Sequence, residues 1–277
     1  MKDEMSWDEA VDWLRSPLGN PQIASDAYLD KDLVKNIERF RKSNEYIETI
    51  NSLKLYCTNN YPTLLDIGAG NGISSIAFAL EGFKVTSLEP YPSDSVGSGA
   101  IRWLVNYYKL TNVIVVEAFG ENLPFNNQVF DIVYGRQVMH HAHDLKKFIA
   151  ETARVLKQGG VLITVRDHVI KDENDKQRFL KKHPLHHLYG GENAFRIEEY
   201  SGAITVAGLK IKKTMSPSES PINLEPWNKV KVTETLKKQL GNLIGGIPLF
   251  TSIAWSLLKI RFDRMPGKLY SFIAIKE

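Results

Sequence analysis

The sequence predicts an α/β protein built on a doubly wound, mostly parallel sheet. Between residues 63 and 166, short apolar runs alternate with stretches of helical periodicity, which is typical of consecutive strand–helix units. The runs Val-Ile-Val-Val and Val-Leu-Ile-Thr-Val do not alternate with polar residues, so their strands are expected to be buried on both faces of a parallel sheet. A chain of 277 residues with 43% apolar and 24% charged residues also excludes the disordered, collagen-like and coiled-coil classes.

Residues 5–60 are expected to be helical. A capping-box pattern at Ser6 and Glu9 begins a first helix, and a second is predicted from about Lys31 to Leu55. After Pro62, the predicted strands are 63–67, 84–89, 113–117, 130–134 and 161–166. The helices between them are predicted at 72–81, 97–108 and 145–156, the last one stopped by Gly159-Gly160. A helix at 197–207 and strands at 209–215 and 269–275 follow.

The strongest local signal is the run from Leu64 to Gly72, Leu-Leu-Asp-Ile-Gly-Ala-Gly-Asn-Gly. Its glycines let the backbone approach a ligand closely, and the helix that follows offers free N–H groups to a negative group. A dinucleotide fingerprint needs glycine at its sixth position, where this chain has Ile73. Asp66 would repel a pyrophosphate but suits a cationic ligand, such as a sulfonium with an α-amino group. Glu89 ends the next strand, where an acid can accept both hydroxyls of a ribose.

Six segments occur together in the order and spacing of a known family. They are 64–72, the Val-Thr-Ser-Leu-Glu-Pro run ending at Pro90, 121–125, 130–134, 139–141 and 153–161. On these segments the chain resembles the class I S-adenosylmethionine-dependent methyltransferases of the type-11 methyltransferase-domain group, over about residues 60–170. The resemblance implies a Rossmann-like, seven-stranded sheet whose last strand is antiparallel. It also implies S-adenosylmethionine as cofactor and S-adenosylhomocysteine as product.

The resemblance implies roles for individual residues. The methionine part of the cofactor is expected to contact Asp66, Gly68, Ala69, Gly70, Gly72, Arg136 and Gln137. The ribose is expected at Glu89 and Pro90, and the adenine at Phe119, Gly120 and Glu121. Many relatives carry an aspartate where this chain has Phe119, so here we expect stacking, the Gly120 N–H and Glu121 to hold the adenine.

All seven histidines lie between residues 140 and 187, in segments that follow the fourth and fifth predicted strands. Ligands bind outside the carboxyl ends of such strands, and histidine is suited to take a proton near neutral pH. The candidate catalytic residues are His141, His168 and Arg166. Three readings stay open: structural packing of His140 and His141, a base or orienting role, and a metal site from His183, His186 and His187 with Asp167. The last spacing matches no known motif, so no metal is expected.

Residues 216–268 separate the last two strands and have a different character. Residues 206–277 hold 12 Lys and Arg against 5 Asp and Glu, whereas residues 1–205 hold 23 against 27. The stretch from Gln239 to Leu258 is uncharged, but its glycines, Pro248 and polar residues argue against a bilayer span. We expect a helical lid or an oligomer surface, with peripheral membrane contact through 240–258 as the alternative.

We therefore expect a helical cap at 1–60, a cofactor-binding core at 61–215 and 269–277, and an insertion at 216–268. The predicted function is methyl transfer to an oxygen or nitrogen of a small-molecule, glycan-like or lipid-linked acceptor. An oxidoreductase and a non-catalytic cofactor-binding module are the alternatives. No nucleic-acid partner is expected. The first residues lack an apolar signal segment, which favours a cytoplasmic location.

Overall fold

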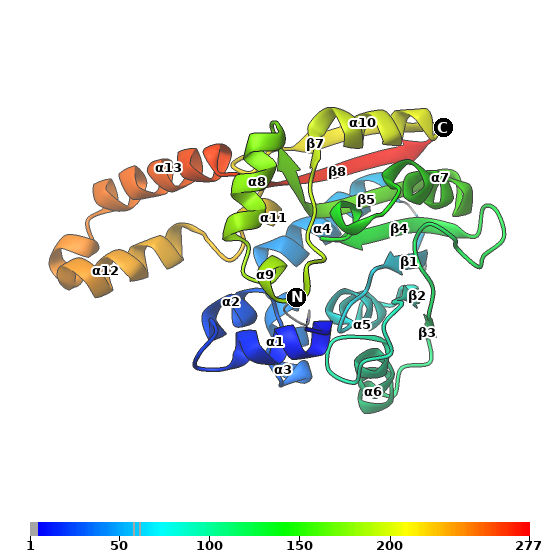
Figure 1. Ribbon diagram of the computed structural model, residues 1–277, viewed down its shortest axis with the longest axis horizontal. Helices are drawn as coiled ribbons and strands as arrows, with labels where there is room; N and C mark the ends of the chain where they lie inside the picture. Colours follow the sequence, from blue (N-terminus) through cyan, green and yellow to red (C-terminus); the bar gives the residue numbers. More distant parts are fainter. Residues whose placement is uncertain (1–4, 58, 61) are drawn as a thin grey trace.

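The computed structural model describes residues 5–57, 59–60 and 62–277. At its centre is a twisted sheet with the strand order β3-β2-β1-β4-β5-β8-β7, and a short β6 pairs with β5 at the side (Figure 1). The first five strands run parallel, and β8 is antiparallel to both β5 and β7. The expected mostly parallel sheet with an antiparallel last strand is confirmed. The strands are β1 (Thr63–Ile67), β2 (Lys84–Leu88), β3 (Val113–Val116), β4 (Phe130–Arg136), β5 (Leu156–Ile170), β6 (Phe195–Arg196), β7 (Leu209–Met215) and β8 (Lys268–Lys276).

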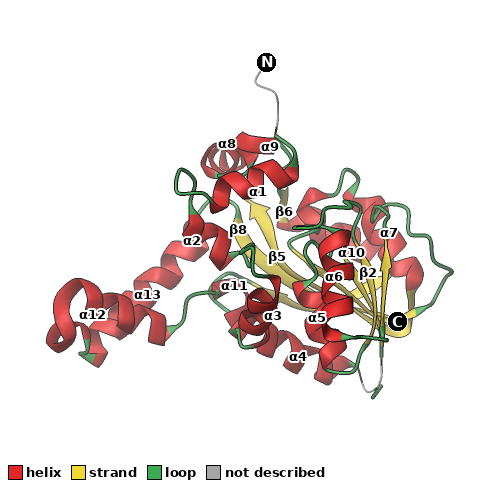
Figure 2. Ribbon diagram, turned by 90° about the horizontal axis from the view of Figure 1, so that it is seen from below, coloured by secondary structure: helices red, strands yellow, loops and turns green. Residues whose placement is uncertain are grey.

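Helices cover both faces of this sheet (Figure 2). The helices before β1 are α1 (Trp7–Arg15), α2 (Pro21–Asp26), α3 (Leu33–Arg41) and α4 (Asn44–Tyr56). Within the core are α5 (Ile73–Leu80), α6 (Ser98–Tyr108), the 3-10 turn η1 (Met139–His141), α7 (Leu145–Val155), α8 (Glu173–Lys182), α9 (His186–Tyr189) and α10 (Ile197–Val206). The last three are α11 (Pro221–Leu224), α12 (Lys229–Gly245) and α13 (Pro248–Arg264).

Neighbouring residues of each strand point to opposite faces of the sheet, so the sheet divides two hydrophobic cores. Leu64 packs in a core with Phe40 of α3 and Phe78 of α5, whereas Leu65 packs in the other core with Phe148 of α7. All five side chains are buried. The run at 161–165 is buried on both faces of β5 as predicted. The same prediction for 113–116 is wrong, because these residues form β3 at the edge of the sheet, where Ile114 is 65% exposed.

The helix predicted from Lys31 to Leu55 is wrong in one respect, because the chain forms two helices there. Ser43 has extended dihedral angles and begins α4, with its hydroxyl accepting the Tyr46 N–H at 3.1 Å. The same hydroxyl donates to the Phe40 carbonyl at the end of α3, at 2.7 Å. A serine side chain that satisfies backbone groups of both helices stabilises the break.

The stop signal assigned to Gly159-Gly160 is also wrong. Helix α7 ends at Val155 and β5 begins at Leu156, so both glycines lie within the strand. The register of β5 against β4 shifts in this region. Phe130 pairs with Leu156, whereas Ile132, two residues later, pairs with Val161. Gly159 has a φ of 75°, and glycine adopts that angle without strain. The two glycines therefore form an irregular bulge.

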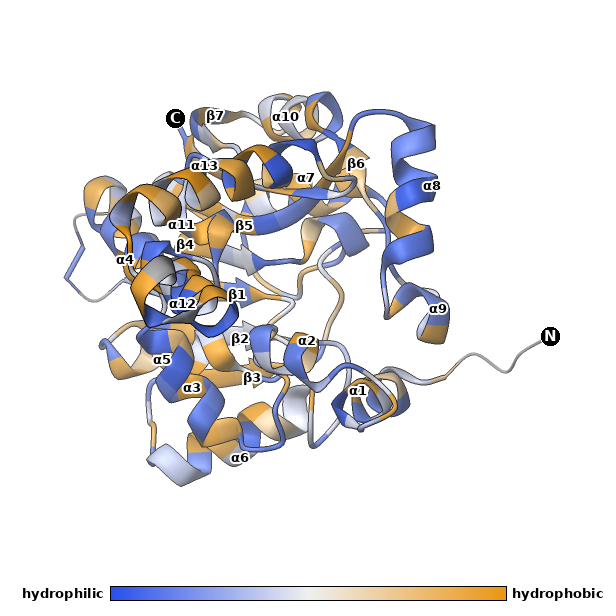
Figure 3. Ribbon diagram, turned by 90° about the vertical axis from the view of Figure 1, so that its left-hand side faces the viewer, coloured by the Kyte–Doolittle hydropathy of each residue, from blue (hydrophilic) through white to orange (hydrophobic). Residues whose placement is uncertain are grey.

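The insertion forms a helical hairpin that extends away from the sheet (Figure 1). Helix α12 is kinked at Gly241, and a contact of 3.0 Å between the hydroxyls of Thr233 and Thr251 links α12 to α13. Apolar residues lie along both helices (Figure 3), and several of them are exposed, Leu243 by 91%. Val232 and Thr251 are buried, so the hairpin has both buried and exposed side chains, and its role as a lid or an oligomer surface stays a prediction. Among the described residues, no helix combines the length and the apolar character that a membrane crossing needs.

Candidate cofactor and acceptor site

The glycine loop joins β1 to α5 at the carboxyl end of the parallel strands. Gly68, Gly70 and Gly72 have φ angles of 68°, 55° and 85°, which side chains other than glycine rarely adopt. The N–H groups of Gly68 and Ala69 both donate to the Leu88 carbonyl, at 2.9 and 3.0 Å. The loop is thereby held against the end of β2, beside Glu89.

The three glycines have different surroundings. A Cβ atom added to Gly68 would lie 2.3 Å from a methyl carbon of Val138, and one added to Gly72 would lie 2.9 Å from Ile101. At Gly70 no atom lies within 4 Å of such a Cβ. Gly70 therefore faces open space, as expected for the point where a ligand approaches the backbone.

Asp66 lies under this loop with its side chain fully buried. One carboxylate oxygen, Oδ2, accepts the hydroxyls of Ser74 and Ser75 at 2.7 and 2.6 Å, and the other, Oδ1, has no hydrogen-bond partner. Burial raises the pKa of Asp66 to about 6, although the two serines lower it. A buried carboxylate oxygen that accepts no hydrogen bond raises the free energy of the folded protein. Oδ1 is therefore suited to accept a hydrogen bond from a cationic ligand.

Glu89 follows β2 and is almost as deeply buried, with 6% of the residue exposed. Its Oε2 accepts the Gly70 N–H at 2.7 Å, and its Oε1 accepts the Tyr91 N–H at 3.1 Å. Burial raises the pKa of Glu89 to about 7, and the charge of Asp66 adds to this rise. Each oxygen keeps one lone pair for a further donor, which matches the predicted ribose contact. Pro90 follows it and is half-buried.

The segment predicted to border the adenine lies on the loop after β3. Phe119 is 58% exposed and therefore free to stack on a ring. Gly120 is buried, and an added Cβ would lie 2.3 Å from the ring of Phe148. Glu121 accepts the backbone N–H of His143 at 2.9 Å. These contacts leave the adenine assignment a prediction.

Arg136 and Gln137 end β4 and face the helices before β1. Arg136 pairs with both oxygens of the buried Glu45 on α4, at 2.6 and 3.2 Å. It also donates to the Gln137 side chain at 2.8 Å, and its guanidinium lies 5.5 Å from the centre of the Tyr28 ring. Its ion pair with Glu45 raises the pKa of Arg136 despite burial. Arg136 therefore holds the N-terminal helices against the end of the sheet.

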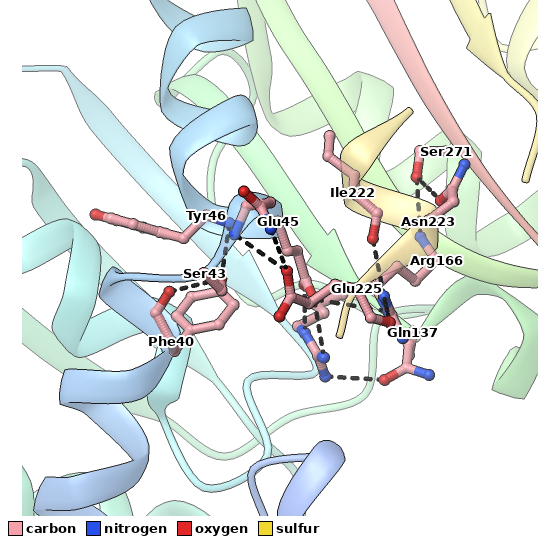
Figure 4. A network of polar contacts seen from close by, with 12 residues as sticks. Phe40, Ser43, Glu45, Tyr46, Gln137, Arg166, Ile222, Asn223, Glu225 and Ser271 are labelled. Carbon is pink, nitrogen blue, oxygen red and sulfur yellow. Dashed lines mark hydrogen bonds and ion pairs between the residues drawn. The ribbon is translucent and has the colours of Figure 1, made fainter. Parts of the chain in front are cut away.

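Arg166 belongs to the same network, which Figure 4 shows from close by. Its Nε lies 3.6 Å from Glu45, and one terminal nitrogen donates to the carbonyls of Ile222 and Glu225 at 2.8 Å each. Its backbone N–H donates to Ser271 on β8 at 3.1 Å. Burial lowers the pKa of Arg166, and the positive charge of the neighbouring Arg136 lowers it further. The structure thus places this predicted catalytic residue as a link between β5, α4 and α11.

Gln137 and Arg166 share an unusual backbone feature, with φ angles of 51° and 63°. Left-handed angles outside glycine cost about 1 kcal/mol or more and cluster at functional sites. Both residues lie on neighbouring strands, near the carboxyl end of β4. Gln137 directly precedes Val138, whose side chain lies against Gly68, so one of these strained residues adjoins the glycine loop.

The predicted histidine rim is present, and its members differ in access. His141 is exposed, and its Nδ1 lies 3.1 Å from the Gly191 carbonyl. Since a carbonyl only accepts, Nδ1 must carry the proton, and Nε2 of the neutral ring is left free to accept one. His168 is less accessible, with Nδ1 donating to the Gly267 carbonyl at 2.6 Å. Burial lowers the pKa of His168 to about 4.

His140 lies between these two rings, at 4.2 Å from the centre of His141 and 4.8 Å from that of His168. It is fully buried, and its Nδ1 lies 3.1 Å from Asp167. Burial lowers the pKa of His140 well below its usual value. His183 and Glu192 join the cluster, at 3.7 Å from each other. His186 and His187 are not part of the group of convergent ligand atoms, and the His187 ring contacts the Lys181 carbonyl at 2.7 Å.

Two residues of the site, Glu45 and Glu192, were not singled out from the sequence, whereas Tyr28 was considered there as a candidate cofactor contact. Glu45 lies 91 positions from its partner Arg136, and no local pattern marks a single acid in a helix. Tyr28 accepts the Asn71 amide at 2.8 Å with its carbonyl, which ties the N-terminal helices to the glycine loop. Glu192 lies in the Gly-Gly-Glu-Asn run, whose glycines indicated only an ordered loop. Its burial is what identifies it.

Comparisons with known proteins agree with this geometry. Residues 65–164 match the family model described as methyltransferase domain. An uncharacterized methyltransferase of Bacillus subtilis, YcgJ, is 33% identical over 117 residues, which are 40% of this chain and 42% of that protein. A ubiquinone biosynthesis O-methyltransferase of Rhizobium leguminosarum is 26% identical over 60% of this chain and 65% of that protein. The chain thus spans less than two thirds of the length of both relatives.

The fold has counterparts among solved structures. A geranyl diphosphate methyltransferase in complex with S-adenosylmethionine superposes with a TM-score of 0.60 at 15% identity, covering 99% of this chain and 97% of the other. The matched family domain contains Asp66, the glycine loop, Glu89 and the ends of β4 and most of β5. The residues predicted from the sequence to hold S-adenosylmethionine all lie within this matched domain. Residues 65–164 thus match the methyltransferase-domain family, and the fold of the chain is that of solved methyltransferase structures.

Proposed function

We propose that this protein transfers the methyl group of S-adenosylmethionine to an oxygen or nitrogen of a small-molecule, glycan-like or lipid-linked acceptor. One observation carries the proposal. Two buried carboxylates, Asp66 and Glu89, flank a glycine loop whose Gly70 faces open space. Buried acids with unsatisfied lone pairs fit a ligand that brings a positive charge and hydroxyl donors.

Each acid has a separate role in this proposal. Asp66 Oδ1, which has no partner, would accept the α-amino group. Glu89 would accept the ribose hydroxyls while it stays bonded to the Gly70 N–H. Arg136, committed to Glu45, would orient the nearby Gln137 and the N-terminal helices and not itself bind the cofactor.

When bound, S-adenosylmethionine supplies a methyl group on an electrophilic sulfonium. The protein then mainly has to align an acceptor with that methyl group and exclude competing water. His141 is the side chain best placed to take the proton of an acceptor hydroxyl or amine, because its Nδ1 is bonded to Gly191 and its ring is exposed. His168, being half-buried and bonded to Gly267, would act on the acceptor only indirectly.

Ligand stabilisation tests the proposal most directly. A ligand at a hundred times its dissociation constant stabilises a protein by about 2.7 kcal/mol, which for a chain of this size raises the melting temperature by roughly 5–10 °C. We expect that rise with S-adenosylhomocysteine and none with NAD. Stabilisation by NAD alone would favour an oxidoreductase and overturn the proposal. Incubation with labelled S-adenosylmethionine and fractionated small-molecule and lipid extracts then identifies the acceptor and separates an enzyme from a binding module.

The affinity for S-adenosylhomocysteine is expected to rise with pH. Only the ionised Glu89 can accept two hydroxyls, and its pKa in the free protein is about 7. The ionised fraction falls about tenfold for each pH unit below that pKa, so binding should be about tenfold weaker at pH 6 than at pH 8. Isothermal titration at both values measures this ratio. An equal dissociation constant at pH 6 and pH 8 would remove Glu89 from the binding site.

The stability of the free protein should change in the opposite direction. The pKa of Glu89 is raised from 4.5 to about 7 on folding. Between these values the folded state binds more protons than the unfolded state, so this group makes the free energy of unfolding fall as pH rises. Ligand-free and ligand-bound melting curves should therefore diverge as pH rises from 6 to 8.

Replacing His141 with glutamine should lower kcat by about 10²-fold or more, which is the usual contribution of a positioned base. The Michaelis constant for S-adenosylmethionine should hardly change, because the ring lies outside the glycine loop. Steady-state kinetics with the identified acceptor provide the measurement. His143→Gln is the matched control, since His143 is also exposed and contributes only its backbone N–H to Glu121. Equal kcat values for both variants would exclude a base at His141.

We further propose that the α12–α13 hairpin contacts a lipid surface, which would bring a lipid-linked acceptor to the site. Leu243 and Leu249 lie near the turn of the hairpin and are 91% and 65% exposed. Lysines and arginines border the uncharged stretch on both sides, at 237, 238, 259 and 261. Exposed apolar side chains beside basic ones suit an anionic lipid interface.

A double Leu243→Ser and Leu249→Ser variant should bind anionic vesicles at least tenfold more weakly than the unchanged protein. Burying a leucine contributes about 1.5–3 kcal/mol, and 1.4 kcal/mol is a factor of ten. Sedimentation with phosphatidylglycerol-containing vesicles measures the loss. Leu55→Ser, at a 77% exposed position on α4, is the control. A stable dimer with no vesicle binding would instead identify the hairpin as an oligomer surface.

A further inference from the structure

Three potential metal ligands converge behind the acceptor rim. His140 comes from η1 after β4, His168 from β5, and Glu192 from the loop between α9 and β6. One ligand atom from each of the three lies within 4.8 Å of the others. Among the described residues this is the group whose geometry could hold an ion. It differs from the set considered from the sequence, because it contains neither His186 nor His187.

The outer nitrogen of each histidine ring is already engaged. His140 Nδ1 lies 3.1 Å from Asp167, and His168 Nδ1 lies 2.6 Å from the Gly267 carbonyl. In metal sites a ligating histidine uses its second nitrogen in this way, on a carboxylate or a backbone carbonyl. The arrangement fixes the ring orientation and leaves Nε2 with its lone pair directed to the cluster.

The carboxylate of Glu192 has too few donors for its burial. Its side chain is 4% exposed, and its hydrogen bond comes from the Tyr189 hydroxyl at 2.9 Å. His140 Nε2 and His183 Nδ1 lie 3.8 and 3.7 Å from its two oxygens, which is beyond hydrogen-bond length. Among the described residues no lysine or arginine lies within ion-pair distance of it. A buried carboxylate facing two imidazole lone pairs needs a positive charge between them.

We propose that His140, His168 and Glu192 form a binding site for one divalent first-row transition-metal ion of the Zn²⁺ type. Two imidazoles and one carboxylate are a ligand set that such ions use with open positions left for a further ligand. Bonds of about 2.1 Å place ligand atoms about 3.4 Å apart around a tetrahedral ion, so binding would draw the three side chains together. The open position would accept an oxygen of the acceptor and help to ionise it.

The test uses the full, tag-free chain after treatment with a chelator. Titration with Zn²⁺ and with Co²⁺, read by calorimetry and by the visible absorption of Co²⁺, should show one site per chain. Glu192→Gln keeps the shape of the side chain but removes the charge, and it should weaken Zn²⁺ binding at least tenfold. Tyr189→Phe, which removes the hydrogen bond to Glu192, should weaken it by a smaller factor.

A double His186→Ala and His187→Ala variant is the control, because these histidines lie outside the cluster. It should bind Zn²⁺ as the unchanged protein does. Loss of binding in this variant together with full binding in Glu192→Gln would place the ion on the surface and overturn the proposal, as would an absence of stoichiometric binding. Circular dichroism without metal verifies that each variant is folded. The site stands independently of the methyl-transfer proposal, since S-adenosylhomocysteine binding should be the same in Glu192→Gln.

Discussion

The Glu89→Gln variant is expected to bind S-adenosylhomocysteine at least about a hundredfold more weakly than the unchanged protein. A hydrogen bond to a charged group contributes about 1.5–3 kcal/mol, and the ribose would lose two of them, which corresponds to a factor of a hundred or more. The amide also has one oxygen where the carboxylate has two. One of the N–H groups of Gly70 and Tyr91 would then face another donor.

A matched control lies at the end of the neighbouring strand. Glu117 follows β3 as Glu89 follows β2, but it is exposed and bonds to Ser98 and Arg102. Glu117→Gln should leave the dissociation constant within a factor of two. Calorimetry on the two variants and the unchanged chain compares them directly. If Glu89→Gln bound the ligand as tightly as Glu117→Gln, the ribose could not be held by Glu89.

Two glycine substitutions in one loop should have opposite consequences. Gly68→Ala is expected to destabilise the fold by about 2–4 kcal/mol. The new Cβ would lie 2.3 Å from Val138, and the backbone φ there is 68°. Overpacking costs about 1–3 kcal/mol, and the strain of the left-handed backbone adds to this cost. Gly70→Ala meets no atom within 4 Å, so only the strain of about 1–2 kcal/mol remains. Its new methyl group would occupy the side from which the ligand approaches.

Urea unfolding and ligand titration separate the two effects. Gly68→Ala should lower the midpoint of unfolding strongly, whereas Gly70→Ala should stay folded and bind S-adenosylhomocysteine at least tenfold more weakly. Gly82→Ala provides the control for strain alone, because its φ is 94°, it lies in the turn after α5, and no atom is within 4 Å of an added Cβ. Normal ligand affinity in Gly70→Ala would mean that the cofactor does not approach this glycine.

The sequence predicted the sheet well because the position of a strand can be inferred from a short run of neighbouring residues. The apolar run at 161–165 is buried in β5 as its composition indicates, and β1 and β7 have the bounds expected. The sequence also singled out the glycine loop and Glu89 as a candidate site, because the loop is a run of consecutive residues and Glu89 ends the next predicted strand. These features depend on neighbours along the chain.

Other features depend on contacts between distant segments, and these were missed. The break at Ser43 depends on one hydroxyl that bonds in two directions, although the apolar periodicity continues across it. The bulge at Gly159-Gly160 exists because β4 pairs with Leu156 and Val161. Glu192 approaches His140 only because the chain from α9 returns over β5. None of these partners is visible from the local sequence.

The anchoring of α11 has a consequence for how this fold can change. Asn223 bonds to Ser271 on β8 at 2.6 Å, and Arg166 bonds to the carbonyls of Ile222 and Glu225. The connection after β7 is therefore fastened to the sheet before α12 begins, and β8 resumes directly after α13. The hairpin thus lies between two segments that are each fixed to the sheet, α11 before it and β8 after it. A change in the length of the hairpin would therefore leave the pairing of β7 with β8, and with it the sheet that carries the glycine loop, in place.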